Sequence, residues 1–96
     1  MARTTTVSPV DVGERVRLLI DAMGMSATDF ARLCGLTPQH INNYTSGRAM
    51  LSVTAAAAIA AATGVTFDYL YRGDRSSLPL RLVTLLSDEE RRRSAS

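Results

Sequence analysis

Residues 26–47, SATDFARLCGLTPQHINNYTSG, decide the fold, because they predict two short helices joined by a tight turn. Ser26 is a favourable N-cap for the first helix, and Asp29 follows in its first turn. Gly35 tolerates a positive φ, so it predicts the end of that helix and a reversal of the chain. Thr37 then caps the second helix, and Pro38 takes its first position, where no N–H is needed.

Both predicted helices have an apolar side. Apolar positions 30, 31 and 34 form one stripe on the first helix, and Ile41 and Tyr44 form the inward side of the second. The side chains left to point outward from the second helix are Gln39, His40, Asn42 and Asn43. Amide side chains can hydrogen-bond bidentately to adenine, and an α-helix fits the DNA major groove. The N-terminus of such a helix also favours phosphate. These residues are therefore our candidates for contacts with DNA bases.

The spacing of Ala31, Gly35 and Ile41 among these apolar positions resembles the helix-turn-helix of the Cro and lambda-repressor-like (Xre-type) family. The run GVTFDYLYRGD at 64–74 is similar to the last helix of such domains, which carry a Gly-Val-Ser/Thr-x-Asp-aromatic-Leu pattern. The resemblance covers about residues 10–74. It implies an all-α, compact five-helix lambda-repressor-like DNA-binding domain whose second motif helix lies in the major groove.

The resemblance also implies contacts with the DNA backbone. Arg48 stands where relatives usually carry a basic residue that meets the backbone; a solvent-exposed arginine without that role is the alternative. Thr28 stands near the position where many relatives carry a phosphate-binding Gln, and Thr37 and Ser46 complete the expected set. Thr45 and Ser46 replace an acidic and a basic residue of many relatives, a departure that concerns DNA affinity rather than the fold.

The segments before and after the motif predict further elements. Residues 1–7 are expected to form a flexible arm, in which Arg3 either touches DNA or is merely disordered. A helix is expected from Ser8 to Gly24, and Ser52 is expected to cap an alanine-rich helix over 53–63. An apolar exposed side on this helix over 53–63 would be either a contact surface or only a result of the alanine-rich composition. The helix expected between Ser8 and Gly24 should have one apolar face and one solvated face. The apolar face consists of Val12, Val16, Leu19, Ile20 and Met23, and the solvated face of Glu14, Arg15, Arg17 and Asp21.

Residues 75–96 lie outside the resemblance. Residues 75–87 predict an amphipathic segment, either a helix that begins near Ser77 and Pro79 or a strand over 80–82. Its apolar side chains either pack back on the domain at 8–74 or form a dimer seam, and we expect the seam; they are Leu82, Val83, Leu85 and Leu86. Residues 88–96, with opposed acidic and arginine blocks, are expected to form a charged, solvated tail.

Composition excludes several classes of protein. The 96 residues suit one domain, and 46% hydrophobic content is enough for a core. The sequence has no run of 18 apolar residues, its first ten residues lack the apolar core of a signal peptide, and Cys34 is the only cysteine, so the expected location is cytoplasmic. His40 and Cys34 fall on opposite sides of the motif, so we expect no nucleophile–base pair. The sequence has no CxxC, HExxH or phosphate-binding glycine loop, so we expect no catalytic residue, no metal and no cofactor. All eleven basic residues are arginines, which suits phosphate contacts but also a GC-rich genome.

Two classes of function remain open. The first is a sequence-specific regulator that binds double-stranded DNA through residues 37–44. It would be a repressor, acting as a homodimer on a two-fold symmetric operator, and an antitoxin that regulates its own operon is a sub-case. The second is a protein-interaction module that keeps the fold without operator binding and has an unidentified protein partner. The net charge of only +2 and the lack of arginine among the outward residues favour the second class. Salt dependence of DNA binding separates the two.

Overall fold

The first five helices all begin at a hydroxyl side chain. Each of these residues accepts a hydrogen bond from the backbone N–H three positions later; they are Ser8, Ser26, Thr37, Ser52 and Thr66. The computed structural model describes residues 7–95, so the predicted contact of Arg3 with DNA lies outside the described residues. The helices are α1 (Pro9–Ala22), α2 (Ala27–Cys34), α3 (Pro38–Thr45), α4 (Val53–Thr63), α5 (Phe67–Arg72) and α6 (Leu80–Ala95).

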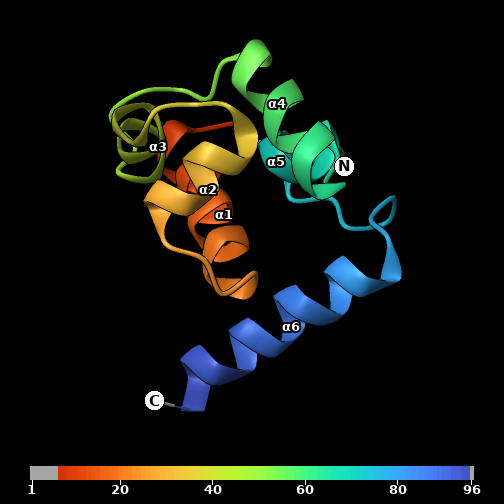
Figure 1. The fold of residues 1–96 in the computed structure, drawn as a ribbon. Helices are drawn as coiled ribbons and strands as arrows, with labels where there is room; N and C mark the ends of the chain where they lie inside the picture. Colours follow the sequence, from red (N-terminus) through yellow and green to blue (C-terminus); the bar gives the residue numbers. More distant parts are fainter. Residues whose placement is uncertain (1–6, 96) are drawn as a thin grey trace.

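Helix α1 is the centre of the arrangement. It packs against α3, α5 and α6, while α2 packs against α3 and α4, and α4 against α5 (Figure 1). The apolar stripes predicted for α1, α2 and α3 meet in one core, in which Val16, Leu19, Phe30 and Ile41 are fully buried. The predicted all-α fold is therefore confirmed: α1 to α5 form the five-helix domain, and α6 is the C-terminal extension.

The C-terminal segment is a helix, and its leucines pack back onto the domain. Leu82 and Leu86 are fully buried in their own chain, and Val83 and Leu85 are partly buried against the same core. The structure therefore favours the alternative to the expected dimer seam, because these four residues pack against the core of their own protomer and Leu82 and Leu86 have no surface left for a partner. Leu80, which is 80% exposed, lies on the other side of α6.

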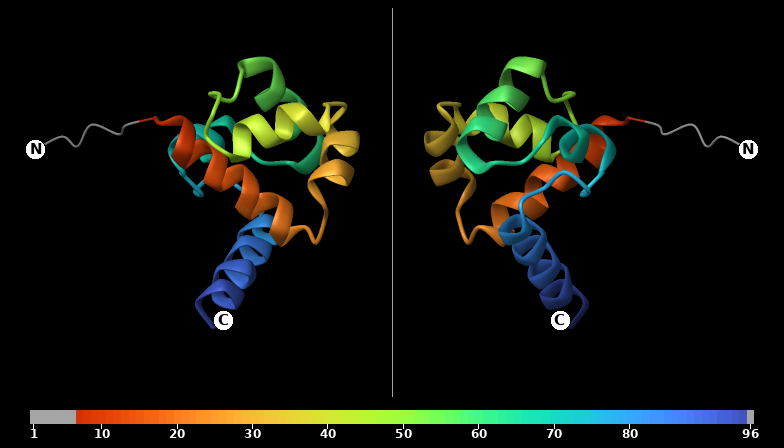
Figure 2. Two further views of the ribbon diagram at one scale, coloured as in Figure 1. Left: turned by 90° about the vertical axis from the view of Figure 1, so that its left-hand side faces the viewer. Right: turned by 90° about the vertical axis from the view of Figure 1, so that its right-hand side faces the viewer.

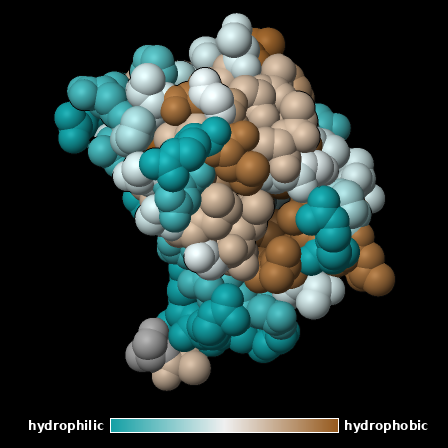
Figure 3. Space-filling view, viewed as in Figure 1, coloured by the Kyte–Doolittle hydropathy of each residue, from teal (hydrophilic) through white to brown (hydrophobic). Residues whose placement is uncertain are grey.

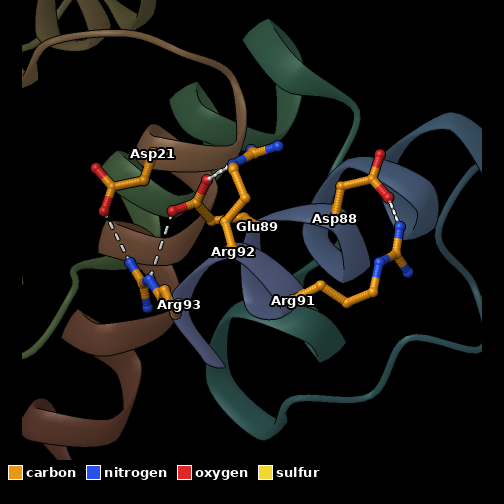
Figure 4. A network of polar contacts seen from close by, with 6 residues as sticks. All are labelled: Asp21, Asp88, Glu89, Arg91, Arg92 and Arg93. Atoms are coloured by element: carbon orange, nitrogen blue, oxygen red, sulfur yellow. Dashed lines mark hydrogen bonds and ion pairs between the residues drawn. The ribbon is translucent and has the colours of Figure 1, made fainter. Parts of the chain in front are cut away.

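Helix α6 also continues further than expected. Residues 88–95 continue this helix toward the C-terminus, and residues 90–95 are exposed, as expected for a solvated segment (Figures 1 and 2). Its acidic and basic blocks stabilise the helix itself, because Arg92 donates to Glu89 three residues earlier, at 2.6 Å between Nη2 and Oε1. Arg91 likewise contacts Asp88 (Figure 4).

Ion pairs connect α6 to the rest of the domain. Arg93 reaches Asp21 of α1, with 2.7 Å between Nη2 and Oδ2 (Figure 4). Arg75 donates two hydrogen bonds to the Glu90 carboxylate, at 2.9 and 2.8 Å. The predicted solvated face of α1 is therefore only partly correct: Asp21 pairs with α6, and Arg15 donates to the Leu70 carbonyl oxygen at 3.1 Å.

Candidate nucleic-acid interface

The turn between α2 and α3 is built from one small residue and one glycine. Ala31 is fully buried where the two helices approach, and its carbonyl oxygen accepts the Leu36 N–H at 2.8 Å. Gly35 ends α2 with φ 72°, a left-handed backbone conformation that residues other than glycine rarely adopt. Leu36 is partly buried against the core, which fixes the turn from inside. The turn predicted at Gly35 is therefore confirmed.

Helix α3 is anchored at both ends. At its start, Thr37 Oγ1 accepts the His40 N–H at 3.1 Å, which leaves the hydroxyl proton of Thr37 available to a phosphate oxygen. In its middle, Ile41 is fully buried. At its end, Tyr44 packs against the core, and its hydroxyl lies 3.5 Å from the Ser52 hydroxyl. The outer face of α3 is thus held in a fixed orientation.

That outer face carries the side chains that the sequence predicts. Gln39, His40 and Asn42 are exposed, and Asn43 is half-buried. Within residues 7–95, none of the three amide groups makes a hydrogen bond. The His40 ring lies 6.5 Å from the Tyr44 ring, measured between centroids, at an interplanar angle of 28°. In Figure 3 the side of the molecule that carries α3 in Figure 1 is mainly hydrophilic, in contrast to the apolar surface toward α4. The face can therefore offer amide donors and acceptors to base edges.

The four residues predicted to contact the DNA backbone differ in their exposure and in whether other groups of the protein already use their hydrogen-bond donors. Arg48 is exposed directly after α3 and forms no ion pair within the described part of the chain. Thr28 is exposed at the start of α2. The Ser46 hydroxyl donates its proton to the Asn43 carbonyl oxygen at 3.2 Å, so it has no proton left for a phosphate. Arg48, Thr28 and Thr37 are therefore the stronger candidates.

Sequence reasoning missed Gly13, which sets the position of α3. Gly13 is buried in the middle of α1, and a Cβ at this position would overlap the carbonyl oxygen of Tyr44. Next to this contact, a Cβ at Gly47 would lie 2.9 Å from Cγ2 of Val10. The available signal was a glycine inside a helical pattern, because glycine destabilises a helix unless close packing requires it.

The only cysteine of the chain is a packing residue. Cys34 is buried, and burial raises the pKa of its thiol to about 11. The thiol therefore stays protonated at neutral pH and is a poor nucleophile. Among residues 7–95, no helix is both long and apolar enough to cross a membrane.

A tight glycine turn, a capped second helix and an outward amide face are the features of a helix-turn-helix DNA-binding protein. A family model described as helix-turn-helix, of the Xre or lambda-repressor-like type, matches residues 16–70, more than half of the chain. The protein therefore belongs to this family of DNA-binding transcription regulators. Comparisons with curated proteins and with solved structures found no match.

Proposed function

We propose that this protein is a cytoplasmic, non-enzymatic repressor that binds a two-fold symmetric operator as a homodimer. Helix α3 enters the major groove, where Gln39, His40, Asn42 and Asn43 read base edges. The observation that carries this proposal is the set of three amide side chains on α3 that have no hydrogen-bond partner within residues 7–95. Asn and Gln amides match the donor and acceptor pair that adenine presents in the major groove.

Phosphate contacts position α3 for this readout. Arg48 supplies the positive charge next to the C-terminal end of α3, and Thr37 and Thr28 supply hydroxyl groups near the N-terminal ends of α3 and α2. The free N–H groups at the start of α3 add to the attraction for a phosphate. These contacts fix the register of the protein on the duplex without reading its sequence.

The dimer interface must use side chains other than the buried leucines of α6. The described surface still exposes large apolar side chains, among them Leu33, Val53, Phe67 and Leu80. Two protomers on one face of B-DNA place their reading helices about 34 Å apart, one turn of the duplex. An antitoxin that represses its own operon would use the same contacts.

The test is selection of duplexes by the purified full chain from sheared genomic DNA at about physiological salt. One enriched motif with two-fold symmetry supports the proposal, and its half-sites should be centred about one turn apart. A double variant Q39A/N42A, whose substituted positions are exposed, is the control and should lose the motif. Sedimentation with and without the selected duplex then gives the stoichiometry.

A second candidate function is a protein-interaction module. The low net charge of +2 and the absence of arginine from the outer face of α3 favour it. A selection that enriches no motif, from protein shown to be folded by circular dichroism, would support this candidate. It would make Leu33 of α2 and Val53 of α4, both exposed, the first surface to mutate.

A further inference from the structure

A hollow of about 320 Å³ lies between α1, the segment around residues 73–75, and α6. Asp11, Glu14 and Leu18 line it from α1, at spacings of three, four and seven that place them on one side of that helix. Gly13, which contacts α3, lies on the opposite side of α1 by the same periodicity. The hollow is therefore separate from the candidate DNA interface.

Tyr69 lies in the wall of this hollow and leaves a polar group unsatisfied. The residue is 1% exposed, and its hydroxyl has no hydrogen-bond partner within the described residues. Native proteins rarely leave a buried hydroxyl without a partner. The guanidinium carbon of Arg75 lies 5.8 Å from the centroid of the Tyr69 ring, and Glu90 of α6 holds that guanidinium through two hydrogen bonds.

The charged groups of α1 in the hollow are also incompletely paired. Arg15 is half-buried and donates to the Leu70 carbonyl oxygen, but no carboxylate within residues 7–95 pairs with it. Asp11 precedes Arg15 by four residues, a spacing at which ion pairs form on helices, and yet no pair forms. The carboxylates of Asp11 and Glu14 have no cationic partner in the described part of the chain either.

We propose that this hollow binds a small zwitterion of the α-amino-acid type. The ammonium group of the ligand lies between Asp11 and Glu14, and its carboxylate accepts hydrogen bonds from Arg15. Leu18 offers an apolar surface to the ligand's side chain. A ligand with both charges suits the hollow, because the side chains without an ion-pair partner there include two carboxylates and one guanidinium.

The charge balance of the walls argues against ligands of one sign. Three arginines and three acidic residues line the hollow, so its formal net charge is zero. A phosphate or nucleotide would face the two unpaired carboxylates of α1, and a simple amine would leave Arg15 without a counter-ion. Since Glu90 comes from α6, the bound ligand would lie against both α6 and α1.

The experiment is a titration of the full, ¹⁵N-labelled chain, without DNA, with each of the twenty standard L-amino acids up to about 5 mM. We expect at least one of them to shift the amide resonances of α1 and residues 69–75 saturably, with a Kd on the order of 0.1–1 mM, as suits a ligand of few atoms. D11N and E14Q should each raise that Kd about five- to tenfold. Both side chains are exposed, so neither variant is expected to disturb folding.

D68N is the matched control, because Asp68 is an exposed acid on α5 that does not line the hollow. It should bind the same amino acid with unchanged Kd. N-acetylated and amidated forms of that amino acid, which lack one of the two charges, should bind at least tenfold more weakly. The proposal is overturned if no amino acid produces saturable shifts, if the singly charged forms bind equally well, or if D11N and E14Q bind as D68N does.

Discussion

The backbone of Gly13 in α1 lies directly against the carbonyl oxygen of Tyr44 near the end of α3. The contact leaves no space for a side chain, and it joins the central helix to α3, the helix that we propose reads DNA bases. The neighbouring contact of Val10 with Gly47 extends the same close approach past the end of α3. The orientation of the outer face of α3 therefore depends on a residue of α1 that does not lie on that face.

Replacing Gly13 by alanine should destabilise the protein, although alanine is the better helix former. The new methyl group would meet a backbone carbonyl, which cannot rotate away as a flexible side chain could. We expect G13A to lower the free energy of unfolding by about 2 kcal/mol, a typical cost of overpacking. Urea denaturation followed by circular dichroism measures this. Ala57→Gly on the exposed side of α4 calibrates helix propensity alone, at about 1 kcal/mol. A G13A protein as stable as the wild type would contradict the close contact.

Replacing Gln39 by alanine should weaken binding to the selected operator by about 1–3 kcal/mol and relax the base preference at one position. The reason is that Gln39 is exposed on α3 with an amide that no other group of the described chain uses. Binding isotherms on the operator and on an unrelated duplex measure the effect. Affinity for the unrelated duplex should stay the same, because base readout makes no contribution there. An equal loss on both duplexes would assign Gln39 to the DNA backbone instead.

Replacing Arg48 by alanine should weaken binding to the operator and to unrelated duplexes alike, in contrast to the replacement of Gln39. A lost phosphate contact weakens binding to every sequence and reduces the slope of log K against log salt by about one. R72A is the matched control, because Arg72 is an exposed arginine on α5 that pairs with Asp68. Titrations at several salt concentrations should show the change in slope for R48A alone. If both variants keep the wild-type slope, Arg48 does not contact phosphate.

Much of the motif could be predicted because its determinants are local. Thr37 caps α3 through a hydrogen bond from the backbone N–H of the third residue after it, and the positive φ angle of Gly35 turns the chain at the end of α2. The outward positions of Gln39 and Asn42 follow from the helical period alone. The role of Ser46 could not be predicted, because its bond to the Asn43 carbonyl is one of several that a serine at a helix end can make.

Replacing Leu86 by alanine should destabilise the entire domain by about 3 kcal/mol, because Leu86 is fully buried. L80A removes the same atoms from the same helix at a position that is 80% exposed, so it should change stability by less than about 0.5 kcal/mol. Urea denaturation measures both variants, and sedimentation of the folded proteins shows whether either changes the oligomeric state. If L86A were as stable as the wild type but no longer formed a dimer, the result would support a dimer interface through the leucines of α6.

The packing partner of α6 could not be predicted from the sequence. The amphipathic pattern of residues 75–87 predicts a helix but fits two partners equally well, the same domain or a second copy. The choice rests on contacts between residues that are far apart in sequence, such as Arg93 with Asp21 and Arg75 with Glu90. Such pairs leave no periodic signal, and neither does the close contact at Gly13.

The pair of Arg75 and Glu90 makes stability depend on acid pH. Hydrogen bonds from Arg75 hold the pKa of the Glu90 carboxyl below its ordinary value of 4.5. A carboxyl with a lowered pKa stabilises the folded state above the pKa of the unfolded chain, and that contribution is lost as the pH falls through the folded-state pKa. Because both side chains are about one-third to one-half exposed, solvent screens the pair, and its contribution is about 0.5 kcal/mol.

The variant E90Q should therefore be less stable than the wild type by about 0.5 kcal/mol near pH 7. This difference should stay constant down to about pH 5 and then shrink as Glu90 becomes protonated in the wild type. Urea denaturation at several pH values between about 3 and 7 measures it. In an R75Q background the same substitution should give a weaker pH dependence, since Arg75 is the main group that lowers the pKa of Glu90, and only the charge of Arg93 remains to lower it. A stability difference that grows toward acid pH would show that the Glu90 carboxyl is destabilised by folding, contrary to its pairing with Arg75.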